Sequence, residues 1–251
     1  MKWHIDLHLH IIDRKFLLIV NQRFMPDTFT CADYLHSRYN INLLGGTVDS
    51  GSFQGYDQSY LINALQTLGE NFVGVTQLPY NTSDDEIIKL NELGVKAIRF
   101  NVNRGSSEDI SRLDYLARSV YELVNWHTEL YIDSNSLTEI TTIVAKLPSV
   151  SIDHLGLSKS GFTNLLSLVD KGVRVKATGF GRIDFDAEEA IRTIYSTNPD
   201  ELMFGTDLPS TRKKRSFRYS DIELINNILK EEEAKKVLYK NALNWYLKIS
   251  V

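Results

Sequence analysis

Short apolar runs alternate with longer segments of helical periodicity along almost the whole chain. The apolar runs are rich in β-branched residues and have the length of buried parallel strands. They lie near Trp3–His10, Asn42–Asp49, Phe72–Leu78, Lys96–Val102, Glu129–Asn135, Val150–Leu155, Val173–Phe180 and Leu202–Leu208. The segments between them repeat apolar residues with the period of an amphipathic helix, as at Tyr60–Leu68, Asp84–Leu93, Glu108–Trp126, Leu137–Leu147, Phe162–Lys171 and Ala187–Ser196.

This alternation predicts an α/β fold of the (β/α)8 TIM-barrel type, because parallel strands need helical crossovers between them. No Pro-, Gly- or Ser-rich linker interrupts the series, so we expect residues 1–251 to form a single domain. The final segment, Ile222–Leu247, is expected to close the barrel as one or two amphipathic helices. The alternative is an open doubly wound sheet, which would need a Gly-rich phosphate-binding turn where the first strand has histidines instead.

Composition and charge narrow the classes of partner. The chain has 251 residues, with 28 Lys and Arg against 32 Asp and Glu, and its 43% hydrophobic residues can bury one substantial core. This mildly acidic balance argues against nucleic-acid or anionic-membrane partners, which favour strongly basic surfaces. Cys31 is the single cysteine, so an intramolecular disulfide and a multi-cysteine zinc site are excluded. The N-terminus has no signal-peptide pattern and no apolar run approaches the roughly 20 residues of a membrane span, so we expect a cytoplasmic protein.

The densest chemical signal is the run His4-Ile5-Asp6-Leu7-His8-Leu9-His10 at the first strand. Because side chains alternate with period two, His4, Asp6, His8 and His10 are predicted to share the inner face of the barrel. His8 and His10 would then lie at the C-terminal mouth, where barrel active sites form. Two imidazoles there can bind a divalent metal or orient and polarise a carbonyl group. His4 lies deeper, which favours a structural role.

Two further strands end in polar residues of the same kind. Ser151-Ile152-Asp153-His154 ends a strand in a histidine, and Gly205-Thr206-Asp207 ends the last strand in an acid. Asp207 by itself could simply cap the turn that follows it. A barrel, however, brings the ends of its first, sixth and eighth strands within reach of one another, so His8, His10, His154 and Asp207 are expected to converge.

The ordered set of motifs resembles the amidohydrolase superfamily, of the amidohydrolase 2 type. The motifs are Asp6-x-His8-x-His10, Gly94-Val-Lys-Ala-Ile-Arg99-Phe-Asn101, Ile152-Asp-His154-Leu-Gly156, Val175-Lys176-Ala-Thr-Gly179, Phe204-Gly-Thr-Asp207-Leu-Pro209 and the terminal Lys240-Asn241-Ala242-Leu243-Asn244-Trp245. More narrowly, they are similar to the branch of predicted metal-dependent hydrolases that contains 2-pyrone-4,6-dicarboxylate lactonase and sugar lactonases. The resemblance spans nearly the whole chain.

The resemblance implies a hydrolase that opens a lactone or similar cyclic ester of a carboxylated or polyhydroxylated small molecule. Asp207 would act as general base on water. His8, His10 and His154 would polarise the carbonyl, either by direct hydrogen bonds or through a metal.

A departure from the family pattern bears on the metal. Metal-dependent members usually supply a histidine or a modified lysine from the middle strands, whereas the fifth strand here reads Leu130-Tyr131-Ile132-Asp133-Ser134-Asn135. A binuclear centre is therefore not expected. One Zn²⁺ or Mn²⁺ on His8, His10 and Asp207, with His154 nearby, stays open. So does hydrolysis without metal, which the resemblance also allows.

Basic residues at predicted strand ends suggest an anionic substrate. Arg99 lies in the fourth predicted strand and Arg104 shortly after it, and Lys176 and Arg182 lie in and just beyond the seventh. Arginine suits bidentate carboxylate binding, although each of these residues could instead pair with a surface acid. The basic run at residues 211–218 could attract a carboxylate or phosphate, or form a solvated loop.

Other functions remain open at this stage. Related branches of the superfamily suggest metal-dependent amide hydrolysis or decarboxylation. Phosphoester hydrolysis, as in TatD-type barrels, would need additional acidic and histidine ligands that the sequence does not show. A non-catalytic barrel that binds an anionic small molecule is a further alternative, and assembly into a homo-oligomer is open for all of them.

Overall fold

Eight parallel strands form the centre of the computed structural model, which describes residues 3–37 and 41–247. In chain order they are β1 (Trp3–Leu9), β2 (Asn42–Asp49), β3 (Phe72–Thr76), β4 (Val95–Phe100), β5 (His127–Leu130), β6 (Val150–Ile152), β7 (Arg174–Ala177) and β8 (Leu202–Phe204). Each strand pairs with the next one in sequence. Backbone hydrogen bonds from Asp207 to His8 and from His10 to Leu208 then join the end of β8 to β1. The predicted (β/α)8 TIM barrel is confirmed.

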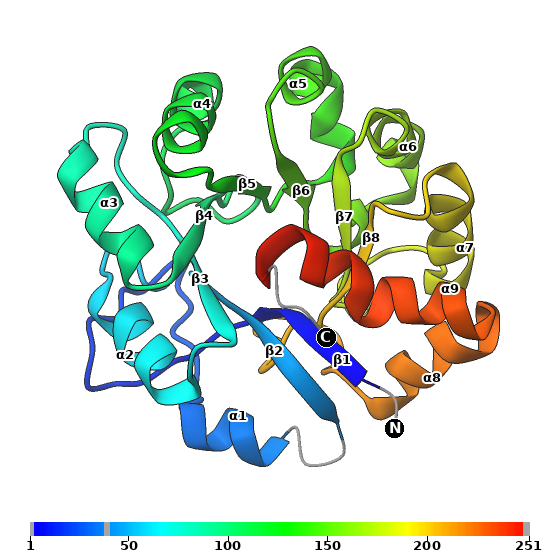
Figure 1. The fold of residues 1–251 in the computed structure, drawn as a ribbon, viewed down its shortest axis with the longest axis horizontal. Coiled ribbons are helices and arrows are strands. Elements are labelled where there is room, and N and C mark those ends of the chain that lie inside the picture. Colours follow the sequence, from blue (N-terminus) through cyan, green and yellow to red (C-terminus); the bar gives the residue numbers. More distant parts are fainter. Residues whose placement is uncertain (1–2, 38–40, 248–251) are drawn as a thin grey trace.

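The helices surround the strand ring, as Figure 1 shows. They are α1 (Cys31–Ser37), α2 (Ser59–Leu68), α3 (Asp84–Glu92), α4 (Leu113–Val124), α5 (Leu137–Val144), α6 (Phe162–Val169), α7 (Ala187–Thr197), α8 (Tyr219–Ile228) and α9 (Glu231–Lys235). The sequence analysis named no helix at α1. Except for β2, which has the predicted bounds, the observed strands are shorter than predicted, because their last residues belong to the loops that form the mouth. None of the described helices is long and apolar enough to cross a membrane.

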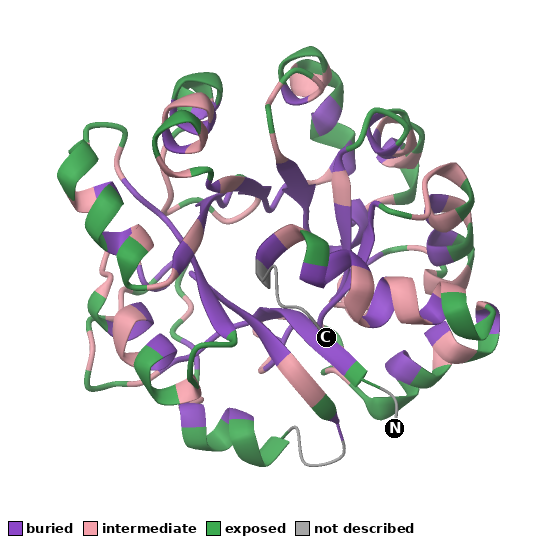
Figure 2. Cartoon of the chain, in the orientation of Figure 1, coloured by how far each residue is buried: buried purple, intermediate pink, exposed green. Residues whose placement is uncertain are grey.

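Apolar stripes attach the helices to the barrel. On α4, Leu113, Leu116, Ala117 and Val120 are buried at the spacing of one helix face. Figure 2 shows the same pattern throughout, with buried strands inside and exposed outer helix faces. The helix ends follow ordinary capping chemistry, since the Ser83 side chain accepts a hydrogen bond from the Glu86 N–H at the start of α3.

The C-terminal segment covers one end of the barrel. After α9 the chain continues through two π-helical turns, Lys236–Lys240 and Leu243–Leu247, and Figure 1 shows this red segment lying across the strand ring. Trp245 stacks on His127 at 4.0 Å between ring centroids, and the Arg174 guanidinium lies 4.3 Å from the Trp245 ring. The buried Tyr246 belongs to the same apolar cluster as Ile5 and Leu7 of β1. This cluster forms the floor beneath the candidate site.

A β-bulge in β1 reverses the direction of its side chains. Asp6 pairs with Gly46 and Leu9 with Val48, so β1 contains one more residue than β2 between these two pairs. Ile5 and Leu7 lie in the inner apolar cluster, whereas the Asp6 carboxylate accepts a hydrogen bond from Tyr34 of α1 in the outer layer. The prediction that Asp6 shares the inner face with His8 and His10 is therefore wrong, because strict alternation does not continue through a bulge.

Candidate active site

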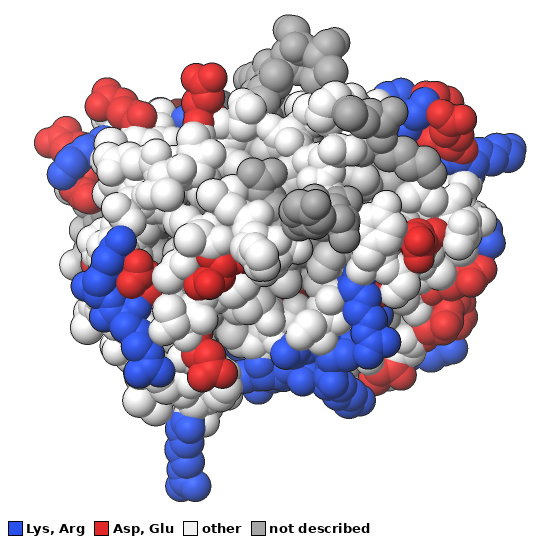
Figure 3. Space-filling view, turned by 90° about the horizontal axis from the view of Figure 1, so that it is seen from below, with Lys and Arg blue, Asp and Glu red and all other residues white. Residues whose placement is uncertain are grey.

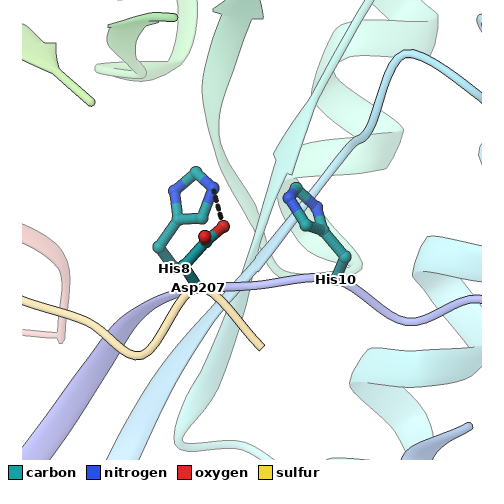
Figure 4. Close-up of side chains that lie close together, drawn as sticks. All are labelled: His8, His10 and Asp207. Atoms are coloured by element: carbon teal, nitrogen blue, oxygen red, sulfur yellow. Dashed lines mark ion pairs between the residues drawn. The ribbon is translucent and has the colours of Figure 1, made fainter. Parts of the chain in front are cut away.

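His8 projects from β1 into a ring of buried carboxylates. Its Nδ1 lies 3.5 Å from Asp153, 3.7 Å from Glu129 and 3.8 Å from Asp49, and its Nε2 lies 3.9 Å from Asp207. All five side chains are fully buried. Figure 4 shows His8 and Asp207 against one another, with His10 just past the end of β1. These distances are longer than ordinary hydrogen bonds, so the imidazole is surrounded by negative groups without being tightly bound by any of them.

Two cationic side chains neutralise most of this negative charge. Arg99 of β4 donates to Asp153 at 2.5 Å, and its Nε lies 3.2 Å from Glu129. Lys176 of β7 donates to Asp49 at 3.2 Å and also to Glu129. Three carboxylates thus face two cations in the interior, where an uncompensated charge is strongly disfavoured.

The pKa shifts of these groups follow from that arrangement. Burial raises the pKa of Glu129 well above its usual range, and the negative charges of Asp153 and Asp49 raise it further. Burial alone would also raise the pKa of Asp153, but the Arg99 guanidinium and His8 outweigh it and hold this pKa well below its usual range. A proton on Glu129 therefore brings the cluster close to charge balance.

Lys176 belongs to this buried cluster. Burial would lower the pKa of its ammonium, but Asp49 and Glu129 outweigh that effect and raise it well above the ordinary value. Lys176 is fully buried and is not among the residues that line the cavity at the mouth. Its position favours a structural charge over the substrate contact that the sequence analysis expected.

His10 and His154 face the cavity in two different hydrogen-bonding states. Nδ1 of His10 lies 2.6 Å from the backbone carbonyl of Asp49, which can only accept, so Nδ1 carries the proton. Burial, followed by the electrostatic influence of His8 and Arg99, holds the pKa of His10 well below its ordinary value. The neutral ring then presents the Nε2 lone pair, which can accept a hydrogen bond or bind a metal but cannot donate to a carbonyl.

His154 can take the opposite state. Its Nδ1 lies 2.7 Å from the Thr178 hydroxyl, which is able to donate to it. Burial and the neighbouring charges of Arg182 and His8 hold the pKa of His154 well below its ordinary value. With Thr178 donating, the neutral ring presents an Nε2–H, which is the donor that a substrate carbonyl needs.

Asp207 lies behind Arg182. The guanidinium donates from Nε to Oδ2 at 2.7 Å and from Nη2 to Oδ1 at 2.9 Å, which is a bidentate ion pair. Asp207 is fully buried, whereas Arg182 lines the cavity. The backbone of Asp207 has φ of 61°, in the left-handed region that non-glycine residues rarely adopt. His154 also has a positive φ, of 50°, so two candidate catalytic residues are among those with a strained backbone.

Gly179 provides the space in which these groups meet. Its φ is 58°, and a Cβ there would lie 2.7 Å from Nδ1 of His154 and 2.9 Å from Cδ of Arg182. It would also lie 3.1 Å from Oδ2 of Asp207. Only glycine fits this position without displacing the surrounding functional groups.

The cavity at the mouth has a small inner part and a larger outer part. The inner part has a volume of about 30 Å³, and its lining includes His10, Arg99, Arg104, Tyr131, His154 and Arg182. The outer part has a volume of about 240 Å³, and its charged lining is Arg104, Asp133, Arg182, Asp184, Arg212, Lys213 and Lys214. Arg104 lines both parts, and its buried Nε has no hydrogen-bond partner. Figure 3 shows Lys and Arg side chains in a run along the lower edge and in groups at both sides of the face in view, with Asp and Glu side chains among them.

The basic run after β8 has a structural contact as well. Arg212 donates to the side chain of Gln22 at 3.0 Å and to the backbone carbonyl of Asn21, and its guanidinium lies 4.5 Å from the ring of Phe24. Asn21 in turn donates to the carbonyl of Arg104 at 3.1 Å. The loop after β1 is therefore fastened to the loops after β4 and β8 at the edge of the cavity.

A single divalent cation fits one group of donors here. The ligand atoms of His8, His10 and Asp207 lie within 4.8 Å of one another, and all three residues are buried. The lone pair on Nε2 of His10 and the unpartnered ring nitrogens of His8 agree with ligation, and three protein ligands leave a position open for water or substrate. Arg182 competes, because it occupies both oxygens of Asp207. Two other groups, built on Asp49 with Glu129 and on Asp153 with His154, include carboxylates that already pair with Arg99 or Lys176.

Most of the predicted site residues meet in one place. His8, His10, His154, Asp207, Arg99 and Arg182 lie around the inner cavity or directly behind it, with Arg104 at its edge. The sequence analysis did not single out Asp49, Glu129 or Thr178. Asp49 ends β2 and Glu129 lies in β5. Asp207 was predicted because it is an acidic residue at the end of a strand, and the same signal could have identified these two residues.

Comparison with known proteins agrees with this geometry. The family profile described as amidohydrolase matches residues 5–247. The chain belongs to the amidohydrolase family. This amidohydrolase is 22% identical over 238 residues to a 2-pyrone-4,6-dicarboxylate hydrolase of Comamonas testosteroni, and the match covers 84% of this chain and 78% of the relative.

Solved structures resemble the amidohydrolase over nearly its full length. A putative 2-pyrone-4,6-dicarboxylic acid hydrolase from Pseudomonas putida is 25% identical, with a TM-score of 0.83 and 97% of each chain covered. A probable enzyme of the same name from Acinetobacter baumannii, solved with citric acid bound, is 22% identical, with a TM-score of 0.83 and coverage of 97% and 98%. A protein from Agrobacterium tumefaciens superimposes with a TM-score of 0.87 at 18% identity, covering 100% of this chain and 97% of its own. The chain is a hydrolase with this barrel.

Proposed function

We propose that this amidohydrolase opens the ring of a small lactone that carries at least one carboxylate. The proposal is carried by one observation: His154, whose Nδ1 lies 2.7 Å from the Thr178 hydroxyl, lines a cavity with a cationic rim, and the Asp207 carboxylate lies directly behind Arg182 of the same cavity. Arg104, whose Nε has no partner, and Arg182 offer guanidinium groups to an anionic substrate. The names of the relatives from Comamonas testosteroni and Pseudomonas putida support a cyclic ester as the substrate class.

In the proposed reaction, Nε2–H of His154 donates to the lactone carbonyl oxygen and polarises it. The oxygen of a water molecule attacks the carbonyl carbon, and Asp207 accepts one of its protons. The negative oxygen of the tetrahedral intermediate stays hydrogen-bonded to His154. The bond between this carbon and the ring oxygen then breaks, and the leaving oxygen takes the proton from Asp207. The product is an open chain with a new hydroxyl and a new carboxylate, whose proton goes to solvent.

In this proposal His10 orients the attacking water and does not polarise the carbonyl. Its Nε2 lone pair can accept a hydrogen bond from the attacking water and so orient it, while its Nδ1–H is held by the carbonyl of Asp49. His8 connects the Asp207 side of the site to the buried carboxylates. The sequence analysis assigned all three histidines to the carbonyl, and the hydrogen bonds support that role best for His154.

A metal can be accommodated in the same arrangement. His8, His10 and Asp207 would hold one Zn²⁺ or Mn²⁺. When bound, such an ion polarises a carbonyl and lowers the pKa of bound water. The same lone pair on His10 supports the second candidate function, metal-dependent amide hydrolysis or decarboxylation of an anionic small molecule.

The decisive experiment combines substrates, metal content and one isosteric variant. Purified wild type is assayed on 2-pyrone-4,6-dicarboxylate, on sugar lactones and on carboxylated amides, before and after chelation, with its metal content measured by elemental analysis. We expect ring opening of a carboxylated lactone, and a loss of about 10²- to 10⁴-fold in Asp207→Asn. Asp85→Asn, at an exposed position of α3, is the matched control and should keep full activity.

The other outcomes separate the alternatives. Near-normal lactone opening by Asp207→Asn would remove Asp207 from the mechanism. Chelator-sensitive turnover of amides or carboxylic acids alone would favour the second candidate function. Binding of citrate, detected by calorimetry, without turnover of any of these compounds would favour a barrel that only binds anions.

A further inference from the structure

Arg182 is both the partner of the proposed base and part of the substrate cavity. It donates two hydrogen bonds to Asp207 and lines the inner and the outer part of the cavity. Each oxygen of Asp207 therefore accepts one guanidinium hydrogen bond, and the carboxylate has no exposed surface. Each oxygen keeps a second lone pair, but a water molecule can reach the carboxylate only after the guanidinium that covers it has moved.

The size of the inner cavity points to the same residue. Its volume of about 30 Å³ is far below the roughly 150 Å³ of an apolar cavity that binds benzene. A six-membered lactone therefore needs a side chain of the inner wall to move. Arg99 is held by Asp153 and by the carbonyl of Ser50, deep in the charge cluster. Arg182 instead stands between the inner cavity and the outer one, so its guanidinium can move outward without breaking that cluster.

The outer cavity has more cationic than anionic groups in its lining, so the moved guanidinium gains a further anionic partner when the substrate brings one. Arg104, Arg212, Lys213 and Lys214 give this region a positive lining, against Asp133 and Asp184. Asp133 already accepts hydrogen bonds from the Asn135 N–H and the Ser158 hydroxyl, and Asp184 accepts one from the Lys159 N–H. A substrate carboxylate in this region would be drawn to Arg182 and to the unpartnered Nε of Arg104.

We propose that Arg182 is a latch that an anionic group of the substrate opens. In the free enzyme the guanidinium covers Asp207 and occupies its oxygens. A substrate carboxylate takes over hydrogen bonds from the guanidinium, an oxygen of Asp207 becomes accessible to water, and the cavity widens. Selectivity for anionic lactones thus arises at the base as well as through binding. This inference rests on the proposed function, in which Asp207 accepts the proton.

The test supplies the lactone ring and the carboxylate as two separate molecules. Wild type is assayed on 2-pyrone, which has no carboxylate, with increasing acetate at constant ionic strength and with chloride as the comparison salt. If acetate shifts the latch from mostly closed to substantially open, the rate on 2-pyrone rises by about fivefold or more. Arg182→Gln should lose this response, and so should Arg182→Lys, which cannot form the bidentate pair. Arg118→Gln on α4, where an exposed arginine pairs with Asp114, is the control and should respond as wild type does.

A second measurement does not depend on turnover. The Nε–H of Arg182, identified in ¹H–¹⁵N spectra by its absence in Arg182→Lys, is expected to shift and to lose protection from exchange when citrate is added. An Nε–H signal that stays in place while other signals report citrate binding would overturn the latch. So would acetate that leaves the rate on 2-pyrone unchanged or lowers it. Failure of wild type to open 2-pyrone-4,6-dicarboxylate or any other lactone is a different result, because it would overturn the proposed function while the citrate titration still decides whether the guanidinium moves.

Discussion

The Asp6 carboxylate on β1 accepts two hydrogen bonds from Thr206, which lies 200 residues further along the chain. The backbone N–H and the hydroxyl of Thr206 each donate at 2.7 Å, and Tyr34 donates to the same carboxylate at 3.1 Å. The Thr206 oxygen also accepts from the Leu208 N–H at 3.2 Å. Asp207 lies between Thr206 and Leu208 in the chain, so these hydrogen bonds fix its left-handed backbone from both sides.

Thr206→Val should weaken this connection. The variant keeps the shape of the side chain but removes the hydroxyl that donates to Asp6 and accepts from Leu208. We expect the free energy of unfolding to fall by about 1–3 kcal/mol and kcat to fall as Asp207 loses its fixed orientation. Urea unfolding and steady-state kinetics measure the two effects. Thr206→Ser keeps the hydroxyl and should retain kcat, so equal kcat values for the two variants would contradict the argument.

Stability should depend on pH through Asp6. Burial raises the pKa of this carboxyl from 3.8 to about 6, although hydrogen bonds from Thr206, His8 and Tyr34 act in the opposite direction. Between these pH values the folded protein holds a proton that the unfolded chain releases. The contribution of Asp6 to stability is thus fully present below about pH 4 and is lost as the pH rises through about 6.

Asp6→Asn removes this titration. The difference in free energy of unfolding between wild type and Asp6→Asn should change by about 2–3 kcal/mol from pH 4 to pH 7, with wild type losing stability relative to the variant as the pH rises. Urea unfolding across this range measures the difference, and Asp85→Asn at an exposed site is the control. A difference that stays constant with pH would show that Asp6 does not titrate in this range.

Gly179→Ala should disable the site more than it destabilises the fold. The new methyl group would meet His154, Arg182 and Asp207 at contact distances that require one of them to move. We expect kcat to fall by about tenfold or more, because small displacements of catalytic groups have large effects. Gly172→Ala is the matched control, since Gly172 has φ of 90° but no atom within 4 Å of the added Cβ. Both variants should lose about 1 kcal/mol through backbone strain, and only Gly179→Ala should lose kcat.

Lys176→Met tests whether the buried ammonium is a structural charge. Its removal leaves Asp49 without its cationic partner and Glu129 with Arg99 alone, so we expect a loss of about 3–5 kcal/mol in free energy of unfolding. The double variant Lys176→Met/Glu129→Gln also removes one of the two acidic groups that lose the ammonium, and it should recover part of this loss. A double-mutant cycle by urea unfolding measures the coupling. Additive losses, together with a raised KM, would instead support the substrate contact expected from the sequence.

The sequence predicted the barrel because strand runs and helical segments alternate in strict order, and each signal is local. The same order placed His8, His10, His154 and Asp207 together, since the strand ends of a barrel must meet. It failed for Asp6, because a bulge depends on how β1 pairs with β2 and leaves no trace in the period of the strand itself. For Lys176 it could not reveal the buried charge cluster, because the partners Asp49 and Glu129 lie 127 and 47 residues away.

The extra residue in β1 also separates the barrel interior into an apolar lower part and a polar upper part. Ile5 and Leu7 face the apolar floor beneath the site, whereas His8 and His10 face the polar chamber above it, and the two pairs follow opposite phases of the same strand. An opposite register shift between His4 and Ile5 compensates for the extra residue, so both strands are again in step at the pair of Leu9 with Val48. Deleting one residue at the bulge would leave that shift uncompensated and would turn either the floor or the histidines to the outside. Conservative substitutions in the floor leave the phase of the strand untouched, so we expect the site to tolerate them better than a change in the length of β1.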